Sequence, residues 1–548
     1  MTDIIFLSIP KLEVKGPILA ITQLTACAKE AGFSAKAIDF NEWLYNQTKD
    51  TSLSHIWDIM DRTLLSDDIK DIEDIYILYF HKFYDEVIKK INPKIIGISV
   101  FSTWTYPNLL IVTREIRNIN PKVKIIIGGP VIASNAKQAL FYTHGITPPK
   151  KSFFDDLKES NLIDDYISGD AEISVVEYLK GNYDYPGINS YDHKPIENQD
   201  NIPTPDYEDI DYEKYPSPAL FIKGSRGCVR KCAFCNVPTL WQKFKWKSAD
   251  KIFEEITYLH NKYPYVKQIK FTDSLTNGNY KEFLKLMELV SDWKEKNRSS
   301  LKVFKSYLSS KHNKNYQDCF GFSIHGQFIC REKNQIKPNM FELMKGAGYL
   351  EPTCGIESGS EKVRKELGKY FSNEAIEYHL DEMNKNKLRM IPLMFVGFPT
   401  ETDKDFQESI DILDMFARYP NVIGMVGMDH PMVVISGTPV FMNPERYYVD
   451  TESLGEMVPS HPSSDLRWKG KYSDYKKRIE RFFIFAHEAQ QRKIYDKPTV
   501  SGNSFTFIKD YMEFKNKDSH VLNIIEKWME GQEHFYNKSW DENRNYKI

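Results

Sequence analysis

The sequence predicts an α/β protein in which a doubly wound parallel sheet is followed by a partial (β/α)6 barrel and then by a helical region. Over residues 1–195, short apolar runs alternate with amphipathic stretches, which is the pattern of a parallel sheet covered by helices. The alternation stops in the acidic, proline-punctuated stretch 196–218 and resumes over residues 219–440, whereas residues 441–548 are helical and aromatic in character. These changes predict a sheet domain, a linker, a barrel domain and a carboxyl-terminal helical region.

The first domain contains five strand-length apolar runs, which together predict a flavodoxin-like sheet. Residues 43–90, between the second and third runs, are rich in aromatic and acidic residues. We expect a helical insertion there that lies outside the basic fold. The expected strands are residues 4–9, 35–40, 95–100, 123–128 and a shorter run around 166–168.

Six strand-like segments, separated by stretches long enough for helices, predict the partial barrel. Barrels of this kind carry their chemistry on the loops that follow the carboxyl ends of the strands. The segments are "ALFIKG", "VKQIKFTD", "FSIHGQFICR", "YLEPTCGIES", "RMIPLMFVGFP" and "NVIGMVGMD".

The composition of the chain narrows the classes of function. Lysine plus arginine (73) nearly balances aspartate plus glutamate (76), so the overall charge gives no field that would attract nucleic acid or an anionic membrane. The apolar run near Met1 is too short to cross a membrane and lacks the features of a signal peptide. The seven cysteines are odd in number and mostly scattered, which does not describe a disulfide framework. We expect a cytoplasmic protein with reduced thiols and no membrane partner.

Cys228, Cys232 and Cys235 form a C-x3-C-x2-C motif on the loop that follows the first barrel strand. A structural zinc site needs four ligands, and no further C-x2-C or H-x3-H pair lies nearby, although zinc stays the alternative. Three thiolates suit a [4Fe–4S] cluster in which one iron stays open for a substrate or cofactor. The spacing therefore favours an iron–sulfur cluster.

The cysteine motif, with Phe234 just before its third cysteine, resembles the cluster loop of the radical S-adenosylmethionine (radical SAM) enzymes. The segments "FTDS", "GIESGSEKVRKELGK" and "VGFPTETDKDF" are also similar to that superfamily. The resemblance implies that the three cysteines ligate the cluster and that its open iron chelates the amino and carboxylate groups of SAM. Reduction would then cleave SAM to a 5′-deoxyadenosyl radical, with an electron donor such as flavodoxin or ferredoxin.

Residues at the ends of the second and fourth barrel strands are candidates for contacts with SAM. Asp273 offers a carboxylate that could accept a hydrogen bond from the ammonium of SAM, and its alternative role is the N-cap of the following helix. The resemblance suggests that Glu357 and Ser358 contact polar groups of SAM, and their alternative role is a helix-capping pair.

The segment "GFPTET" after the fifth strand combines two expected roles. Gly397 and Pro399 are candidates for shaping the adenine pocket. Thr402 and Asp405 have the spacing of a capping box, so we expect these two residues to be structural.

The third barrel strand carries polar residues of one parity. His325, Gln327 and Arg331 share that parity with Ser323, and a polar face inside a barrel points to a substrate or cofactor chamber. These three residues are candidate substrate or SAM contacts, and the alternative is that they are solvated or salt-bridged. Cys354, which has the parity expected of core residues on the fourth strand, is predicted to lie in the core.

The first domain should bind a ligand at the carboxyl ends of its strands, where the strand order reverses. Glycines there let a ligand approach the backbone closely, and hydroxyls can bind a buried polar tail. The candidate binding residues are Ser99, Ser102, Thr103, Gly128, Gly129 and Gly169.

Four segments of the first domain resemble the cobalamin-binding domains that precede the barrel in class B radical SAM enzymes: "PILAITQLTACAKEAG", "IGISVFST", "IIIGGP" and "YISGDAEISVVEYL". The chain has no D-x-H-x-x-G motif, so cobalamin is expected in the base-off form without a protein histidine on cobalt. The alternative is that the domain has lost the cofactor. No G-x-G-x-x-G follows the first strand, which argues against a dinucleotide.

The resemblance implies a cobalamin-dependent methyltransferase that acts on an unactivated carbon or phosphorus centre of an unknown substrate. In that chemistry one SAM supplies a methyl group through cobalamin, and a radical from a second SAM removes a substrate hydrogen. Two alternatives stay open: an enzyme of the same architecture that catalyses cyclisation or rearrangement, and a non-catalytic sensor that binds cobalamin or the cluster.

Two further readings are disfavoured. A methylthiotransferase usually needs a second cluster in the first domain, where Cys27 is the only cysteine of the sequence. Residues 294–315 carry seven basic residues against one acidic, with Phe304 and Tyr307 interleaved, which could bind RNA. A solvated insertion is the favoured interpretation, so a nucleic-acid partner is not expected.

Overall fold

The computed structural model describes most of the chain, and the described residues form two compact units. Met1–Ile222 build the first unit, and the described residues between Lys223 and Gln532 build the second. Among the described helices, none is long and apolar enough to cross a membrane. The described residues are 1–548 except 11, 13, 54–67, 102–104, 131, 133–152, 191–193, 242, 307–316, 429, 436, 455–467, 495–503, 516–517 and 538–548.

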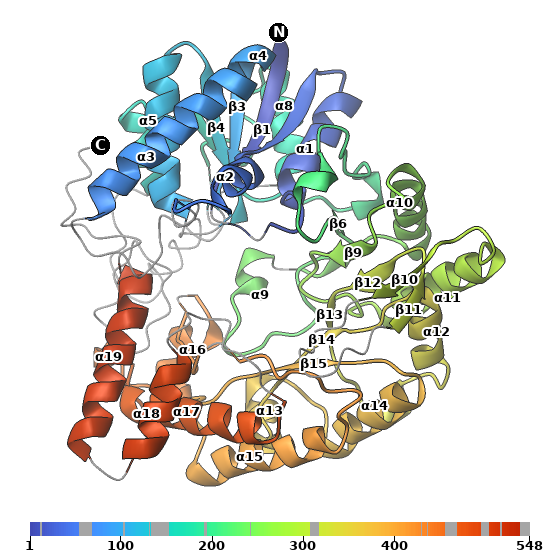
Figure 1. Ribbon diagram of the computed structural model, residues 1–548, viewed down its shortest axis with the longest axis vertical. Helices are drawn as coiled ribbons and strands as arrows, with labels where there is room; N and C mark the ends of the chain where they lie inside the picture. Colours follow the sequence, from blue (N-terminus) through green and yellow to red (C-terminus); the bar gives the residue numbers. More distant parts are fainter. Residues whose placement is uncertain are drawn as a thin grey trace. The chain divides into compact units, whose positions relative to one another are not determined.

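The first unit contains five parallel strands: β1 (Thr2–Ser8), β2 (Ala35–Asp39), β3 (Pro93–Ser99), β4 (Lys124–Gly128) and β5 (Asp165–Ile167). They form one sheet in the order β2-β1-β3-β4-β5 (Figure 1). Ser8 lies beside Ser99 in the register of β1 and β3, and Ser99 lies beside Gly128 in that of β3 and β4. This is the flavodoxin-like order, whose switch point lies between β1 and β3, so the predicted sheet is confirmed.

The predicted insertion is helical where the structure describes it, but the expectation that it lies outside the basic fold is wrong. Tyr76, Phe80 and Phe83 are buried in the same hydrophobic core as Ile98 of β3, because large aromatic side chains bury much apolar surface. The helices of this unit are α1 (Leu19–Glu30), α2 (Phe40–Thr48), α3 (Asp68–Phe83), a π-helical turn (Tyr84–Ile88), α4 (Lys89–Ile91), α5 (Tyr106–Ile119), α7 (Phe153–Glu159) and α8 (Ala171–Leu179).

The acidic stretch 196–218 packs on the first unit through aromatic and charged side chains. Asp206 forms an ion pair with Lys29 of α1 at 2.7 Å. The hydroxyl of Tyr215 donates a hydrogen bond to the buried carboxylate of Asp39 at 2.7 Å. These contacts attach the stretch to α1 and to the end of β2.

The barrel strands are β6 (Ala219–Ile222), β9 (Gln268–Phe271), β12 (Ser323–His325), β13 (Gln327–Phe328), β14 (Thr353–Glu357) and β15 (Ile391–Met394). They form two sheets, with the orders β12-β9-β6 and β13-β14-β15. The predicted sixth strand makes isolated parallel bridges to β15 and its preceding residue, at Ile423 and Gly427. The predicted partial barrel is therefore present, with a weakly paired last strand.

The third predicted strand is divided at Gly326, so the expected continuous alternation over residues 322–331 is wrong. β12 pairs with β9, whereas β13 pairs with β14. A Cβ at Gly326 would lie 2.5 Å from the Cγ2 atom of Thr276, so this close approach requires glycine.

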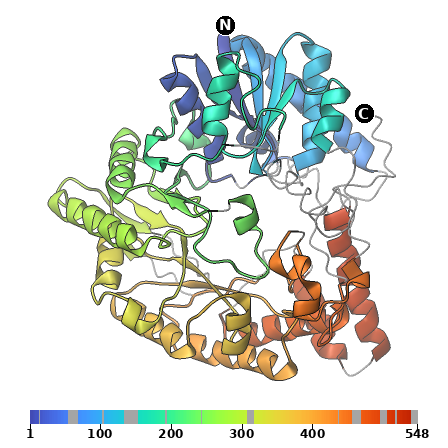
Figure 2. The same ribbon diagram turned by 180° about the vertical axis from the view of Figure 1, so that it is seen from behind.

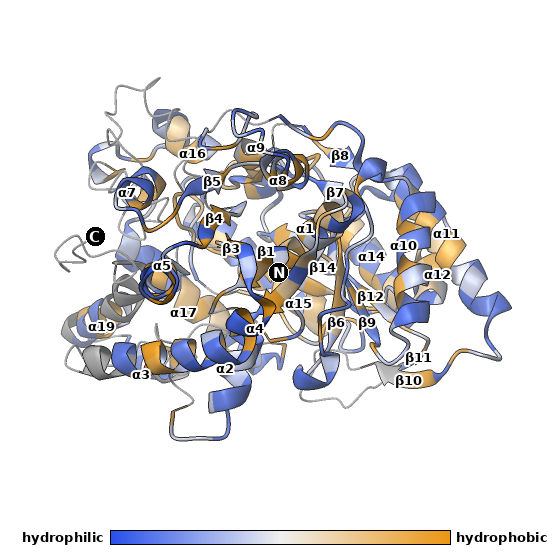
Figure 3. Ribbon diagram, turned by 90° about the horizontal axis from the view of Figure 1, so that it is seen from above, coloured by the Kyte–Doolittle hydropathy of each residue, from blue (hydrophilic) through white to orange (hydrophobic). Residues whose placement is uncertain are grey.

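Helices surround these strands and continue to the end of the described chain (Figure 2). α10 shows the expected pattern: Ile252, Ile256 and Leu259 are buried along one stripe, and Figure 3 colours most of the helix hydrophilic. The helices are α9 (Val237–Leu240), α10 (Ala249–Lys262), α11 (Tyr280–Lys296), α12 (Met340–Ala347), α13 (Glu361–Leu367), α14 (Asn373–Lys385), α15 (Asp403–Ala417), α16 (Pro439–Met442), α17 (Tyr475–Gln491), α18 (Ser504–Phe514) and α19 (Asp518–Asn537).

Candidate active site

The three clustered cysteines lie on one loop (residues 227–236, the cysteine loop), and none of them forms a disulfide bond. Cys232 is buried, while Cys228 and Cys235 are half-buried. The backbone N–H of Arg230 donates to the Cys228 sulfur and that of Val237 donates to the Cys235 sulfur, each at 3.4 Å. Hydrogen bonds of this kind favour the thiolate form that metal binding needs.

The electrostatics of the cysteine loop fit a metal cluster. Burial raises the pKa of the Cys232 thiol to about 11 and also raises the pKa of Cys235, and in both cases Lys369 opposes the increase. Buried thiols of this kind become thiolates when a cationic metal group binds and displaces their protons. Within the described part of the chain, no group of three or more acidic, histidine or cysteine side chains is arranged around a single metal ion.

The cysteine loop is fixed from two sides by its backbone at Ala233. The N–H of Ala233 donates to the carbonyl of Leu367 at the end of α13, and its carbonyl accepts from the N–H of Val440 in α16, each at 3.0 Å. Phe234, which was predicted to assist cofactor binding, packs its ring against Phe395 with centroids 5.1 Å apart. Residues distant in sequence therefore determine where the three sulfurs lie.

A buried ion pair lies next to the cysteine loop. The ammonium of Lys369 is 3.0 Å from the carboxylate of Glu357 and donates to the carbonyl of Gly355 at 2.8 Å. Glu357 has a φ of 71°, an unusual backbone conformation for a non-glycine residue and one that often marks a functional site. A Cβ at Gly355 would lie 2.5 Å from the Glu357 carboxylate, so glycine leaves the room that the pair occupies.

Lys369 was missed by the sequence reasoning, although it ends the segment "GIESGSEKVRKELGK". It follows Gly368, which ends α13 in the left-handed conformation, and the reversal there brings the lysine back beside Glu357. A lysine directly after a glycine C-cap is the signal that could have identified it.

Ser358 forms hydrogen bonds with residues of α13 and α15 and with the N-cap of α13. Its hydroxyl lies 3.1 Å from that of Ser409 and accepts a hydrogen bond from the N–H of Ser360, while its carbonyl accepts from Arg364 at 2.6 Å. The N-cap of α13 is Ser360, so the alternative that Glu357 and Ser358 form the capping pair is wrong.

Asp273 is buried, and its carboxylate is already engaged. It accepts hydrogen bonds from the N–H of Gly224 at 2.9 Å and from the hydroxyl of Ser225. Burial raises the pKa of Asp273 to about 6, even though these hydrogen bonds favour the ionised form. The alternative that Asp273 caps the following helix is wrong, because Asn279 is the N-cap of α11.

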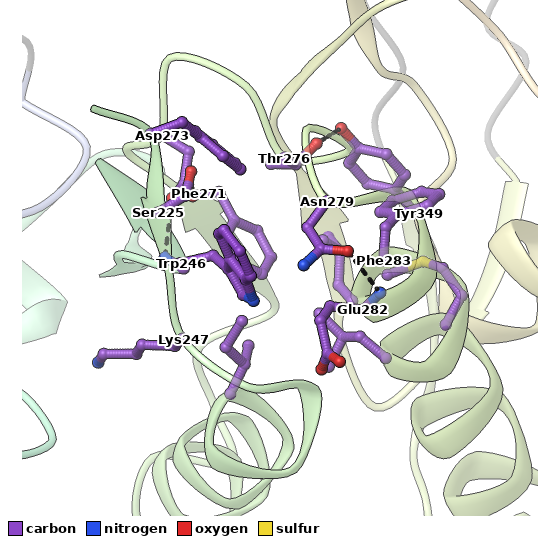
Figure 4. Close-up of a pocket in the computed structure, with 16 residues that line it drawn as sticks. Ser225, Trp246, Lys247, Phe271, Asp273, Thr276, Asn279, Glu282, Phe283 and Tyr349 are labelled. Atoms are coloured by element: carbon purple, nitrogen blue, oxygen red, sulfur yellow. Dashed lines mark hydrogen bonds between the residues drawn. The ribbon is translucent and has the colours of Figure 1, made fainter. Parts of the chain in front are cut away.

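Asp273 lines a small cavity of about 30 Å³ next to the hairpin of β7 (Ser225–Arg226) and β8 (Lys245–Trp246). Figure 4 shows Asp273 and Trp246 on one side of it, and Asn279 and Phe283 on the other. A cavity of this volume has room for about one or two water molecules. It is therefore too small to hold a ligand as large as SAM.

The three polar candidates of the third strand lie in different surroundings. His325 Nε2 is 2.9 Å from the hydroxyl of Ser323, and Gln327 is half-buried at the start of β13. Arg331 lies beyond the strand, donates to the carbonyl of Asn277 at 2.9 Å and stacks over Tyr280 at 4.9 Å. Because the strand is broken at Gly326, His325 lies in the sheet that contains β9 and Gln327 lies in the sheet that contains β14. Arg331 lies outside both sheets.

Cys354 is fully buried in the core, as predicted. Its sulfur lies 3.5 Å from that of Cys330, which is also fully buried. The capping box of Thr402 and Asp405 at the start of α15 is likewise confirmed, with both reciprocal hydrogen bonds present.

Ser99 ends β3 at the switch point of the first unit, and Gly128 ends the adjacent strand β4. Gly129 has a φ of 138°, and a Cβ on it would lie 2.1 Å from the Val100 carbonyl oxygen, so this position requires glycine. Gly169 also has a positive φ, 73°, after β5. Ser102 and Thr103 lie outside the described residues.

Two family models match the chain. The radical SAM superfamily matches residues 222–413, and the B12 binding domain matches residues 72–147. The first region contains the cysteine loop and the barrel strands β9 to β15, and the second contains β3 and β4 of the first sheet.

The curated relatives are distant. An uncharacterized methyltransferase of Pyrococcus horikoshii is 24% identical over 345 residues, 59% of this chain and 65% of that protein. An uncharacterized protein of Methanocaldococcus jannaschii is 22% identical over 348 residues, 61% and 65% of the two chains. A ribosomal protein uS12 methylthiotransferase of Thermosipho africanus is 24% identical over 222 residues, 39% and 45%. The chain thus spans about two thirds of the length of the first two relatives.

Solved structures share the fold. The radical SAM methyltransferase TsrM of Kitasatospora setae, with cobalamin and a [4Fe–4S] cluster bound, aligns with a TM-score of 0.54 at 12% identity over 96% of this chain and all of that chain. The cobalamin-dependent SAM radical enzyme OxsB aligns with a TM-score of 0.55 at 14% identity over 95% and 72%. The chain therefore carries a B12-binding domain and a radical SAM domain, in the fold of cobalamin-dependent radical SAM enzymes.

Proposed function

We propose that this protein is a cobalamin-dependent radical SAM methyltransferase that acts on an unactivated carbon or phosphorus centre. The observation that carries the proposal is the presence, on one chain, of the three-cysteine loop after a barrel strand and a flavodoxin-order sheet with glycine-rich strand ends. The methyltransferase named among the relatives supports it.

When bound, the cluster and SAM would supply a 5′-deoxyadenosyl radical and cobalamin would supply a methyl carrier. Cys228, Cys232 and Cys235 would ligate the cluster as thiolates. Lys369 adds a positive charge beside those sulfurs, and with Glu357 it forms a fixed pair of opposite charges at the end of β14. Glu357 would accept a hydrogen bond from the ammonium group of SAM.

In the first unit, Gly128 and Ser99 would lie against cobalamin at the switch point, where small residues let a large flat ligand approach the backbone. The sequence has no D-x-H-x-x-G motif, so we propose the base-off form without a protein ligand on cobalt.

The methylthiotransferase activity named for one matched relative is not proposed here. Residues 1–222 contain one cysteine, Cys27, and it is buried in α1. One thiol cannot provide the three ligands of a second cluster.

A product assay tests the proposal. Anaerobically reconstituted protein, loaded with hydroxocobalamin and given a strong reductant and SAM labelled on its methyl group, should form S-adenosylhomocysteine and transfer the label to cobalamin. With its true substrate it should form both S-adenosylhomocysteine and 5′-deoxyadenosine, because each reports one half of the cycle. Deoxyadenosine without S-adenosylhomocysteine, together with a product of unchanged carbon count, would instead support cyclisation or rearrangement.

A further inference from the structure

The loop that follows β15 (residues 395–402, the β15 loop) lies against the cysteine loop. Its first residue, Phe395, packs on Phe234 with ring centroids 5.1 Å apart. The N–H of Phe395 donates to the carbonyl of Glu357 at 3.0 Å. A displacement of the β15 loop would therefore change its contacts with both the cysteine loop and Glu357 of the Glu357–Lys369 pair.

The conformation of the β15 loop depends on Glu401. The N–H of Gly397 donates to the Glu401 carboxylate at 3.0 Å, which closes the loop on itself. Gly397 has a φ of 83°, a conformation that favours glycine, and Glu401 is fully buried. A buried carboxylate needs a partner of opposite charge to offset its lost hydration.

That partner comes from the carboxyl-terminal region, whose role the sequence did not indicate. Arg481 of α17 donates to the Glu401 carboxylate at 2.9 Å and to the Glu401 carbonyl at 3.2 Å. Its other terminal nitrogen donates to Asp403 at 2.8 Å. Arg481 is itself 3% exposed, so this guanidinium is a buried and strongly directional contact.

One turn earlier on α17, Arg478 packs directly under the glycine of the same loop. A Cβ at Gly397 would lie 2.5 Å from the Cγ atom of Arg478. Arg478 is fully buried, donates to the carbonyl of Trp468 at 2.6 Å and stacks over the Trp468 ring at 3.5 Å. Its position is thus fixed independently of the loop, and α17 presents a rigid surface to it.

The opposite side of the loop is bound by α13, the helix that leads to Lys369. Lys362 donates to the carbonyl of Thr400 at 3.3 Å, and the hydroxyl of Thr400 donates to Glu366. The β15 loop therefore lies between α13 and α17, and the α17 side supplies the buried guanidinium.

We propose that Arg481 is a positioning residue of the SAM site: it fixes the β15 loop so that Phe395 stays packed on Phe234 of the cysteine loop and hydrogen-bonded to the carbonyl of Glu357. The inference rests on the proposed function and extends it by assigning a role to the carboxyl-terminal helices. It does not require Arg481 to touch SAM or any of the three cysteines.

The experiment compares anaerobically reconstituted full-length Arg481→Gln with wild type, and with Arg492→Gln as the matched control. Arg492 caps the same helix and pairs with Asp414 at 2.8 Å, away from the β15 loop. Iron content and the dissociation constant for SAM, by equilibrium dialysis, are measured for each. We expect unchanged iron in all three proteins, SAM binding weakened about tenfold or more in Arg481→Gln, corresponding to about 1.4 kcal/mol, and no change in Arg492→Gln.

If Arg481→Gln does not fold, the milder variants Arg481→Lys and Glu401→Gln test the same inference. Both retain part of the contact and should bind SAM at an intermediate level with full iron content. Wild-type affinity for SAM in Arg481→Gln, or in both milder variants, would overturn the inference while leaving the proposed function intact. Wild-type protein with a full cluster but no SAM binding would overturn both.

Discussion

Lys369 and Glu357 form a buried ion pair, 3.0 Å apart, beside the sulfur of Cys232. Attraction to Glu357 raises the pKa of Lys369 despite its burial, so the ammonium keeps its charge at any physiological pH. Both partners are little exposed, and salt therefore screens their interaction weakly.

Replacing Lys369 by methionine should destabilise the protein by about 3–5 kcal/mol, because Glu357 would be left as an uncompensated buried charge. The loss of a positive charge near the sulfurs should also make a bound cluster harder to reduce. Denaturant unfolding and a potentiometric titration followed by electron paramagnetic resonance measure the two effects. Lys365→Met, on an exposed position of α13, should change neither; an unaltered reduction potential in Lys369→Met would contradict the electrostatic role.

Alanine at Cys228, Cys232 and Cys235 together should abolish iron and sulfide binding, whereas wild type should contain about four of each per chain. Metal and sulfide analysis of anaerobic protein provides the measurement, and Cys27→Ala, a buried cysteine of the first unit, is the control. Zinc in the wild type, or iron that persists in the triple variant, would show that the cysteine loop has another role.

Gly128→Leu should block uptake of hydroxocobalamin with little loss of stability. A Cβ at Gly128 meets ordinary contact, 3.6 Å from the Ile167 carbonyl oxygen, so we expect the fold to tolerate a side chain there and the side chain to obstruct the proposed cobalamin site. At Gly129 the same test is uninformative, because a Cβ would collide with Val100 at 2.1 Å and unfold the strand end. Absorbance titration measures cobalamin uptake by Gly128→Leu, and thermal unfolding shows whether the substitution has cost stability. A Gly128→Leu protein that binds base-off cobalamin normally would disprove the site.

Asp273 should make the stability of the protein fall as the pH rises from about 3.8 to about 6. The unfolded chain releases its proton first, while the folded state keeps the Asp273 pKa raised through burial, so its contribution is full below the unfolded pKa and is lost as pH rises through the folded one. The shift corresponds to about 3 kcal/mol at most. The difference in unfolding free energy between wild type and Asp273→Asn, measured across this range, should show that slope; a difference independent of pH would refute it.

The sequence alone determined the features that depend on local pattern. Five apolar runs predicted the strands of the first sheet, since a strand buried on both faces reads as a continuous apolar run. The three-cysteine spacing predicted the cysteine loop, and the Thr402–Asp405 spacing predicted a capping box that the structure contains. Each of these signals lies within a few consecutive residues.

Only the tertiary structure decided which distant residues meet. The regular alternation of residues 322–331 predicted one strand, but the strand is divided between two sheets at Gly326, which lies close against Thr276. Asp273 has the position of a ligand contact in sequence, yet the backbone of Gly224 already engages it. Arg481 carries no local signal of its role, and the glycine before Lys369 marks a helix end but not the partner of the lysine. Packing brings each residue to its partner, Glu401 or Glu357, from a distant part of the chain.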